Sequence, residues 1–232
     1  MRGSVAIFAL LLAACSMSTT SDPLAGSRQA IVVLTENRDT TSGSLQRYER
    51  GSGGAWRAVG GRVEVVVGRT GLADIDAKHE GDGKSPSGVY SFGTAFGFAP
   101  AADFRVPYRQ LRDTTECVDD TASRYYNQIV DRDAVPSVDW SSSEKMRAVS
   151  VYQWGIVVNY NTPAAPKRGS CIFMHIWSGA SSSTAGCTAM PQEDLEAILR
   201  WLDPVANPRL VQFTRSEFKS GGMAAALQIT SP

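Results

Sequence analysis

Short apolar and alternating segments, separated by glycine-rich turns, occupy the chain from residue 30 to residue 69. They are AIVVLT (30–35), GSLQRYER (43–50), WRAVG (56–60) and RVEVVVGR (62–69). The glycine clusters GSGG and GG separate the last three of these segments. Alternation over four to eight residues between such turn signals is typical of β-strands. The pattern therefore predicts β-hairpins in this part of the chain.

The same pattern returns later in the chain. Four further segments have the composition of strands: GVYSF (88–92), WGIVVNY (154–160), CIFMHIW (171–177) and RLVQFT (209–214). The predicted strands do not alternate regularly with helices, so the pattern does not indicate a parallel doubly wound sheet. We therefore expect a mainly β fold.

Helical periodicity is strong in one segment, PQEDLEAILRWLD (191–203). It begins with proline and has two acidic residues in its first turn, both typical of a helix start. Its apolar side chains recur at i, i+3, i+4 and i+7, at Leu195, Ile198, Leu199 and Leu202. A shorter helix is expected around Ser142 to Val149. Residues 216–232 are expected to be a C-terminal tail, in which SGGMAAALQITSP (220–232) forms a final strand or stays loose.

Composition indicates one globular domain, which we place at residues 30–215. The chain has 232 residues, of which 43% are hydrophobic and 20% charged. Its 23 basic and 23 acidic residues balance, so the chain is not built to neutralise nucleic-acid phosphates. Any partner must be recognised at a local site.

The N-terminus has the pattern of an export signal. A short apolar run ends at residue 14 and is too short to span a bilayer. The sequence Leu-Ala-Ala-Cys that ends at Cys15 resembles the bacterial lipobox, which implies lipidation of that cysteine. We expect a signal peptide at 1–14 and a lipidated tether at 15–29. By the same resemblance, Ser16 in place of aspartate favours an outer-membrane anchor. The alternative to a lipobox is an ordinary secretory signal that happens to contain Cys15.

If Cys15 carries lipid, three cysteines remain, and an exported domain with an odd number keeps one free thiol. Cys187 lies between a small flexible loop and a helix start. We therefore pair Cys117 with Cys171 and leave Cys187 reduced, the alternative being that all three are reduced. Zinc is disfavoured because the chain has two histidines and no closely spaced cysteine pair.

Two long polar connections are candidate walls of a site. They are LADIDAKHEGDGKSPSG (72–88) and ECVDDTASRYYNQIVD (116–131). Loops of this length in a compact domain usually bind something or are disordered. The alternative is that both are solvated loops, and His79 is expected to be a surface residue of the first.

His175 and Cys187 are the candidate catalytic pair. On a strand, alternate side chains share a face, so Cys171, Phe173, His175 and Trp177 point one way and Ile172, Met174 and Ile176 point to the core. An imidazole near a thiol can take its proton and return it to a leaving amine. Gly186 permits a tight turn whose amides can face an oxyanion. The alternative is a surface histidine beside a structural cysteine.

Three segments resemble the L,D-transpeptidases with the YkuD catalytic domain. HIWSGASSSTAGCTAMP (175–191) is similar to their active-site motif, GDGKSPSGVYSFGTAFGF (81–98) to a strand motif, and WGIVVNYN (154–161) to the strand before the catalytic histidine. The resemblance covers roughly 30–214. It implies a mainly β, sandwich-like domain with one or two short helices. It also implies that Cys187 is the nucleophile, His175 the base and Gly186 part of the oxyanion site.

The motif departs from the family at two positions. Ala185 and Ala189 stand where many members have histidine and arginine. The nucleophile and base are intact, but polar groups that hold the loop or substrate are missing. Candidate substrate-binding residues are Lys84, Asp119, Asp120, Tyr126, Asn127, Trp177 and Thr188. An equal alternative for the polar loop residues is that they order the loops by hydrogen bonding.

The resemblance implies a lipid-anchored periplasmic enzyme of the cell envelope that acts on peptidoglycan stem peptides. Cys187 would form a thioester with a tetrapeptide and pass it to a stem amine or an outer-membrane lipoprotein. With water as acceptor, the same pair would make a carboxypeptidase or hydrolase. A non-catalytic peptidoglycan-binding lipoprotein is the non-enzyme alternative. No metal or organic cofactor is implied.

Overall fold

The computed structural model describes residues 23–74 and 76–227. The predicted signal peptide and Cys15 lie outside the described residues, as does most of the predicted tether. No helix within the described ranges is long and apolar enough to cross a membrane.

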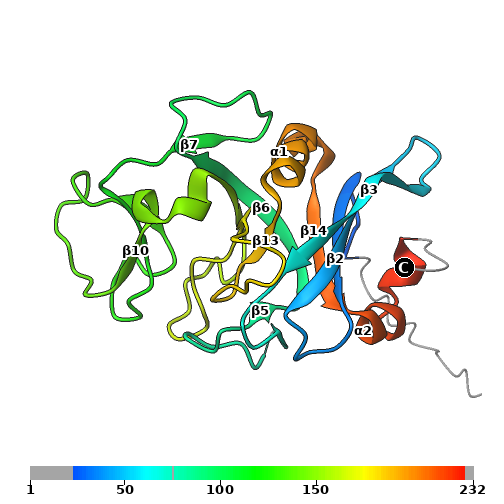
Figure 1. Ribbon diagram of the computed structural model, residues 1–232, viewed down its shortest axis with the longest axis horizontal. Coiled ribbons are helices and arrows are strands. Elements are labelled where there is room, and N and C mark those ends of the chain that lie inside the picture. The colour runs from blue at the N-terminus through cyan, green and yellow to red at the C-terminus, as the bar shows by residue number, and fades with distance from the viewer. Residues whose placement is uncertain (1–22, 75, 228–232) are drawn as a thin grey trace, which may run out of the picture.

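In the described residues, nine strands form one mixed sheet in the order β11-β12-β13-β3-β2-β1-β14-β6-β7. Because β11 also pairs with β6, every strand except β7 belongs to a closed ring. The mainly β prediction is confirmed, and the sheet closes like a barrel (Figure 1). The strands are β1 (Gln29–Thr35), β2 (Ser42–Arg50), β3 (Trp56–Val66), β6 (Gly88–Gly97), β7 (Tyr108–Gln110), β11 (Trp154–Val158), β12 (Phe173–Ile176), β13 (Thr188–Met190) and β14 (Arg209–Thr214).

Strand β1 is buried at every residue because both of its faces are covered. Ile31 and Val33 belong to the apolar cluster enclosed by the sheet. Val32 and Leu34 belong to a second cluster, which includes Phe218 from the C-terminal segment. A strand covered on both sides is expected to be continuously apolar, which explains the unbroken run AIVVLT.

The C-terminal segment differs from the predicted strand or tail, because over its described part it forms α2 (Arg215–Ser220) and α3 (Met223–Ala226). Thr214 and Glu217 form a capping box at the start of α2. Phe218, Met223 and Leu227 are buried against the outer face of the sheet. Helical spacing lets one short segment cover that face.

Helix α1 (Gln192–Trp201) confirms the predicted helix. Leu195, Ile198 and Leu199 are buried in the enclosed cluster together with side chains of β12 and β13. The helix thus closes the barrel core next to the strands that carry the candidate pair.

The prediction of two strands between residues 56 and 69 was wrong, because β3 is continuous through Gly60 and Gly61. The pairing of β3 with β2 shifts register between Leu45 and Arg47. Gly60 has a φ of +68°, and a Cβ there would lie 2.3 Å from the Arg47 side chain. The glycines therefore form a bulge that bends the strand and not a turn.

Residues 142–149 were also predicted incorrectly. They form the strand β10 (Ser143–Lys145) and the 3-10 helix η1 (Met146–Ala148). The strand forms because Glu144 lies opposite Cys117 in an antiparallel pair with β8 (Thr115–Val118).

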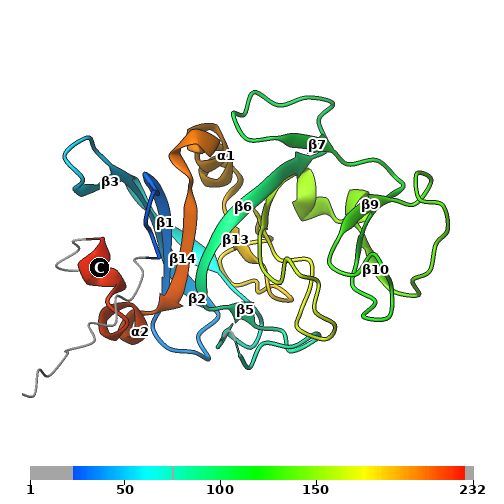
Figure 2. The same ribbon diagram turned by 180° about the vertical axis from the view of Figure 1, so that it is seen from behind.

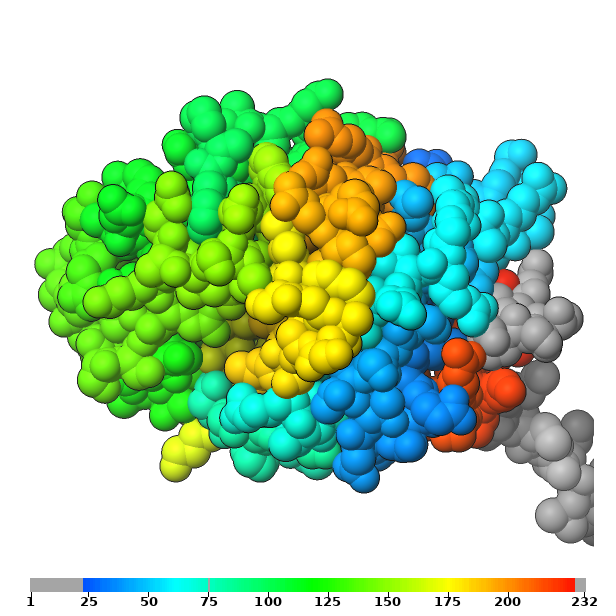
Figure 3. Space-filling model, viewed as in Figure 1, coloured from blue at the N-terminus to red at the C-terminus, as the bar shows by residue number. Residues whose placement is uncertain are grey.

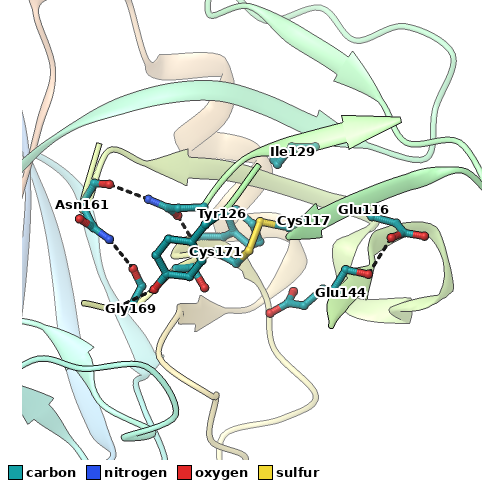
Figure 4. Close-up of a disulfide and its surroundings, with 12 residues drawn as sticks. Glu116, Cys117, Tyr126, Ile129, Glu144, Asn161, Gly169 and Cys171 are labelled. Carbon is teal, nitrogen blue, oxygen red and sulfur yellow. Dashed lines mark hydrogen bonds between the residues drawn. A yellow bond between two sulfur atoms is a disulfide. The ribbon is translucent and has the colours of Figure 1, made fainter. Parts of the chain in front are cut away.

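A three-stranded sheet, in the order β10-β8-β9, lies beside the barrel, with β9 at Ile129–Asp131. Figures 1 and 2 show it at one end of the molecule, with α2 and the C-terminus at the other end. The disulfide Cys117–Cys171 links it to the segment that enters β12 (Figure 4). The remaining short elements are β4 (Leu72–Ala73), β5 (Ser85–Pro86), η2 (Ser150–Gln153) and η3 (Pro204–Ala206).

Candidate active site

Cys187 lies in a turn that is fixed immediately before β13. Its carbonyl oxygen accepts hydrogen bonds from the Thr184 hydroxyl at 2.7 Å and the Ser85 hydroxyl at 2.8 Å. The backbone of Thr184 is itself bonded to Val67 and Arg69. Two hydroxyl donors on one carbonyl hold the Cys187 backbone, and hence its sulfur, in one place. Figure 3 shows the segment after β12, in yellow, on the surface between the green part of the chain and the blue and cyan strands.

Gly186 allows the turn to pack against the 72–88 loop. A Cβ at this position would lie 3.0 Å from the Lys84 carbonyl oxygen and 3.2 Å from the Ile172 side chain. The Gly186 amide donates to the Thr184 hydroxyl oxygen at 3.1 Å. The structure therefore assigns Gly186 a packing role, and its amide is already hydrogen-bonded.

Cys187 is the free cysteine among those described, and it is buried. Its sulfur accepts from the Phe173 amide at 3.3 Å, and its thiol donates to the Cys171 carbonyl at 3.5 Å. Burial raises the pKa of this thiol well above its usual range, and the nearby Glu144 carboxylate adds to the rise. The resting group is therefore a neutral thiol.

His175 is held on β12, whose partner residues are Gly155 on β11 and Ala189 on β13. Its Nδ1 lies 2.7 Å from the Ile176 carbonyl oxygen. Because a carbonyl only accepts, Nδ1 carries the proton and Nε2 of the neutral ring is the basic nitrogen. Burial lowers the pKa of His175 to about 4. The imidazole is thus neutral near pH 7.

The thiol and the imidazole line one cavity of about 340 Å³. Met174 and Ile176 belong to the enclosed core and His175 faces the cavity, as the strand alternation predicted. The alternation does not hold at the ends of the segment, because Ile172 also borders the cavity and Trp177 lines a different cleft. Both predicted loops contribute to the wall. The lining consists of Arg69, Lys78, Glu80, Gly81, Asp119, Glu144, Val149, Val151, Tyr152, Ser170, Cys171, Ile172, His175, Thr184, Ala185, Gly186 and Cys187.

Two residues that the sequence did not single out lie beside the pair. The Tyr152 ring meets the His175 ring edge-on, with centroids 5.1 Å apart. The Tyr152 hydroxyl donates to Glu144 Oε2 at 2.6 Å. Burial, together with the charges of Asp119 and Glu80, raises the pKa of Glu144 to about 7. The segment around Glu144 was predicted as a short helix, so no strand pattern distinguished it.

Lys78 is a buried cation in the same wall, with a side chain only 3% exposed. Its ammonium group lies 2.9 Å from Asp82 Oδ1 and also donates to the His79 carbonyl. The backbone and side-chain donors around Asp82 outweigh the effect of burial and lower its pKa. This ion pair orders the 72–88 loop, and His79 is exposed as predicted.

Of the seven candidate substrate-binding residues, the structure brings Asp119 into the cavity that contains the pair. One of its carboxylate oxygens is buried without a hydrogen-bond partner among the described residues. Lys84 is close through its backbone, but its ammonium group lies 3.7 Å from Asp39. Asp120 accepts hydrogen bonds from Ser141 and Ala122 within its own loop region.

Tyr126 (Figure 4) and Asn127 hold the segment that leads into β12. Asn127 Oδ1 accepts from the Cys171 amide at 2.9 Å, while its amide nitrogen donates to the Tyr160 and Asn161 carbonyls. The Tyr126 hydroxyl donates to Glu80 and accepts from the Gly169 amide. These contacts hold Cys171, which forms the disulfide with Cys117 and whose carbonyl oxygen accepts from the Cys187 thiol.

Thr188 and Trp177 lie away from the cavity. The Thr188 hydroxyl donates to Gln212 inside the barrel. Trp177 lines a separate cleft of about 600 Å³ together with Arg62 and Arg215.

The two departures from the family motif differ in environment. Ala185 is exposed at the cavity, so a larger side chain has room there. Ala189 is 1% exposed and pairs with His175 on one side and Val66 on the other. An arginine at this position would have to enter the packed sheet.

A closed sheet with a thiol and an imidazole in one cavity describes a mainly β catalytic domain. The family model for the L,D-transpeptidase catalytic domain, YkuD, matches residues 29–211. The chain therefore belongs to this family and is an L,D-transpeptidase-type enzyme, as the motifs predicted. The family acts on peptidoglycan, which indicates a role in the cell envelope. No curated protein and no solved structure shows significant similarity to the chain.

Proposed function

We propose that the protein is a peptidoglycan L,D-transpeptidase in which Cys187 forms a thioester with a stem tetrapeptide and passes the acyl group to an amine. The observation that carries this proposal is a neutral thiol and a neutral imidazole in one cavity, with the Nδ1 proton of His175 tied to the Ile176 carbonyl. That hydrogen bond leaves Nε2 as the base, which is the nitrogen that can take the thiol proton.

In the first half-reaction, His175 removes the thiol proton as the Cys187 sulfur attacks the carbonyl carbon of the third residue of the donor. The C–N bond to the terminal D-alanine breaks, and the imidazolium gives its proton to the leaving amine. Because burial raises the thiol pKa, proton transfer accompanies the attack and does not precede it. General-base assistance of this kind contributes roughly 10²- to 10⁴-fold in rate.

In the second half-reaction, the acceptor attacks the thioester and the sulfur recovers its proton. A stem amine gives a crosslink, an outer-membrane lipoprotein gives an attached protein, and water gives a shortened stem. Backbone amides of the Gly186–Cys187 turn are the proposed oxyanion donors. The Gly186 amide joins them only if it exchanges its contact with Thr184 for the substrate oxygen.

The experiment is to incubate the full-length chain with a disaccharide tetrapeptide and identify the products by mass. A crosslinked dimer that has lost one D-alanine supports transpeptidation. Tripeptide alone supports the carboxypeptidase, and no product with wild type or with Cys187→Ala supports the non-catalytic binding protein. Cys187→Ala should form no product.

We also propose that Cys15 carries a lipid anchor that holds the enzyme in the periplasm at the outer membrane. The support is the lipobox-like sequence and the polar segment after it. Fatty-acid labelling of cells should mark the wild type and leave Cys15→Ala unlabelled. A labelled Cys15→Ala variant that fractionates with membranes would reject this anchor.

A further inference from the structure

Glu144 and Tyr152 line the catalytic cavity but have no part in thioester formation as described above. Glu144 comes from β10 of the three-stranded sheet, and Tyr152 comes from η2, which precedes β11. Both residues precede the His175–Cys187 motif in the sequence and lie outside it. Their position in the same cavity calls for a chemical role.

The geometry fixes the Glu144 carboxylate close to the reacting groups. Tyr152 donates to Glu144 Oε2 at 2.6 Å, and the same ring packs edge-on against His175. Tyr152 and Cys187 belong to the same buried cluster. Glu144 lies opposite Cys117 in the strand pair, and Cys117 is bonded to Cys171 beside the thiol. The carboxylate is therefore held by both a side chain and the disulfide-linked backbone.

The second half-reaction needs a proton acceptor that the first does not. A primary amine reaches the enzyme as an ammonium ion near pH 7, because its pKa is about 10. It must lose one proton before it attacks and a second one during the attack. His175 can hold one proton, and in this half-reaction it carries the second of these protons to the Cys187 sulfur, so another group must accept the first. An anionic carboxylate in the cavity both attracts the ammonium ion and can take its proton.

We propose that Glu144, oriented by Tyr152, binds the ammonium group of the acceptor and takes its first proton in the second half-reaction. This inference rests on the proposed function and names the acceptor class as a primary amine. The carboxylate and the ammonium ion become a carboxylic acid and a free amine. The amine nitrogen attacks the thioester carbonyl carbon and the C–S bond breaks. One of the two remaining N–H protons passes through His175 to the Cys187 sulfur, and the other stays on the new amide. Release of the Glu144 proton to solvent completes the cycle.

The charges that face Glu144 define the pH dependence. Asp119 and Glu80 are the like charges, and burial together with them raises its pKa to about 7. Tyr152 and Cys187 face it as neutral groups, and the cations in the cavity lining are Arg69 and Lys78, of which Lys78 is paired with Asp82. The anionic form, which binds the ammonium ion, increases as the pH rises through 7. The ratio of amine transfer to thioester hydrolysis should therefore rise over the same range.

The test compares wild type, Glu144→Gln, Tyr152→Phe and Glu80→Gln as full-length proteins. Glu80→Gln is the matched control, because it makes the same change on a cavity carboxylate that is hydrogen-bonded to Tyr126 and Ser170. Each protein is given a disaccharide tetrapeptide with and without a primary amine acceptor. D-Alanine release in the first turnover measures thioester formation, and product masses measure the ratio of transfer to hydrolysis from pH 5 to pH 9.

Glu144→Gln should keep first-turnover D-alanine release and lose roughly 10²-fold in the transfer-to-hydrolysis ratio at pH 7. Its ratio should follow only the fraction of free amine, which increases about tenfold per pH unit, without the levelling above pH 7 that the Glu144 carboxylate gives the wild type. Tyr152→Phe should retain the pH dependence with a smaller ratio. Glu80→Gln should keep the size of the ratio reached above pH 7 and shift the rise to a lower pH, because the Glu80 charge raises the pKa of Glu144. An unchanged ratio in Glu144→Gln, or an equal fall in Glu80→Gln, overturns the inference while thioester formation stands. A wild type that releases no D-alanine overturns the proposed function as well.

Discussion

The two sides of the cavity are built in different ways. The thiol and the imidazole come from β12 and the turn before β13, where adjacent strands pair in register and His175 lies opposite Ala189. Glu144 and Tyr152 come from the three-stranded sheet and a 3-10 helix, which a disulfide joins to the barrel. In the proposed mechanism, the barrel side supplies the nucleophile and the base, whereas the three-stranded side binds the acceptor amine and takes its first proton. Variants on the two sides should therefore fail in different ways.

The largest effect is expected from His175→Ala, which removes the base from the barrel side. Thioester formation should fall by roughly 10²- to 10⁴-fold, as measured by first-turnover D-alanine release. His79→Ala is the matched control, because it replaces the other histidine of the chain, which is exposed. A His175→Ala variant that matches His79→Ala would show that another group takes the thiol proton.

Removing the disulfide should affect the two sides of the cavity to different extents. The bridge spans 54 residues, and closing a loop of that size stabilises a protein by about 4 kcal/mol on the loop-entropy model. Urea unfolding of Cys117→Ala/Cys171→Ala should show a loss of this size. In the surviving folded protein, amine transfer should fall more than thioester formation. Equal losses in both steps would mean that the bridge supports the barrel side as much as the three-stranded side.

The barrel side was the more predictable of the two from sequence. Its strands carry apolar alternation, and the motif from His175 to Cys187 is local, so a resemblance identified it. Closure of the sheet depends on the pairing of β11 with β6, which joins residues distant in the sequence. Glu144 was misassigned to a helix because its strand exists only through pairing with β8. Tertiary contacts of this kind leave no period in the sequence.

Glu144→Gln should change how stability depends on pH. The folded pKa of Glu144 is raised from 4.5 to about 7, so the folded state keeps a proton that the unfolded state loses. This stabilising contribution is complete below pH 4.5 and is lost as the pH rises through 7. Glutamine does not titrate, and it can still accept a hydrogen bond from Tyr152. The free energy of unfolding of the variant, measured relative to wild type, should therefore rise over this pH range. The total change is up to about 3 kcal/mol, and a difference independent of pH in urea titrations would reject the shift.

The smallest effect is expected at the cavity edge. Ala185 is exposed, so Ala185→His should change the free energy of unfolding by no more than about 0.5 kcal/mol. Ala189→Arg, the matched change at a residue only 1% exposed, should cost several times more because it places a charge in the packed sheet. Thermal unfolding of both variants measures the difference. Similar losses would mean that the environments of the two positions are alike.

The most direct test of the account is the mass of the intact protein after brief mixing with a tetrapeptide donor and an acid quench. The proposed mechanism predicts a wild-type adduct equal in mass to the donor less D-alanine, located on the peptide that contains Cys187. The adduct should form slowly in His175→Ala and be absent in Cys187→Ala. A wild type that releases D-alanine at the same rate as Cys187→Ala, with no adduct on that peptide, would contradict the account.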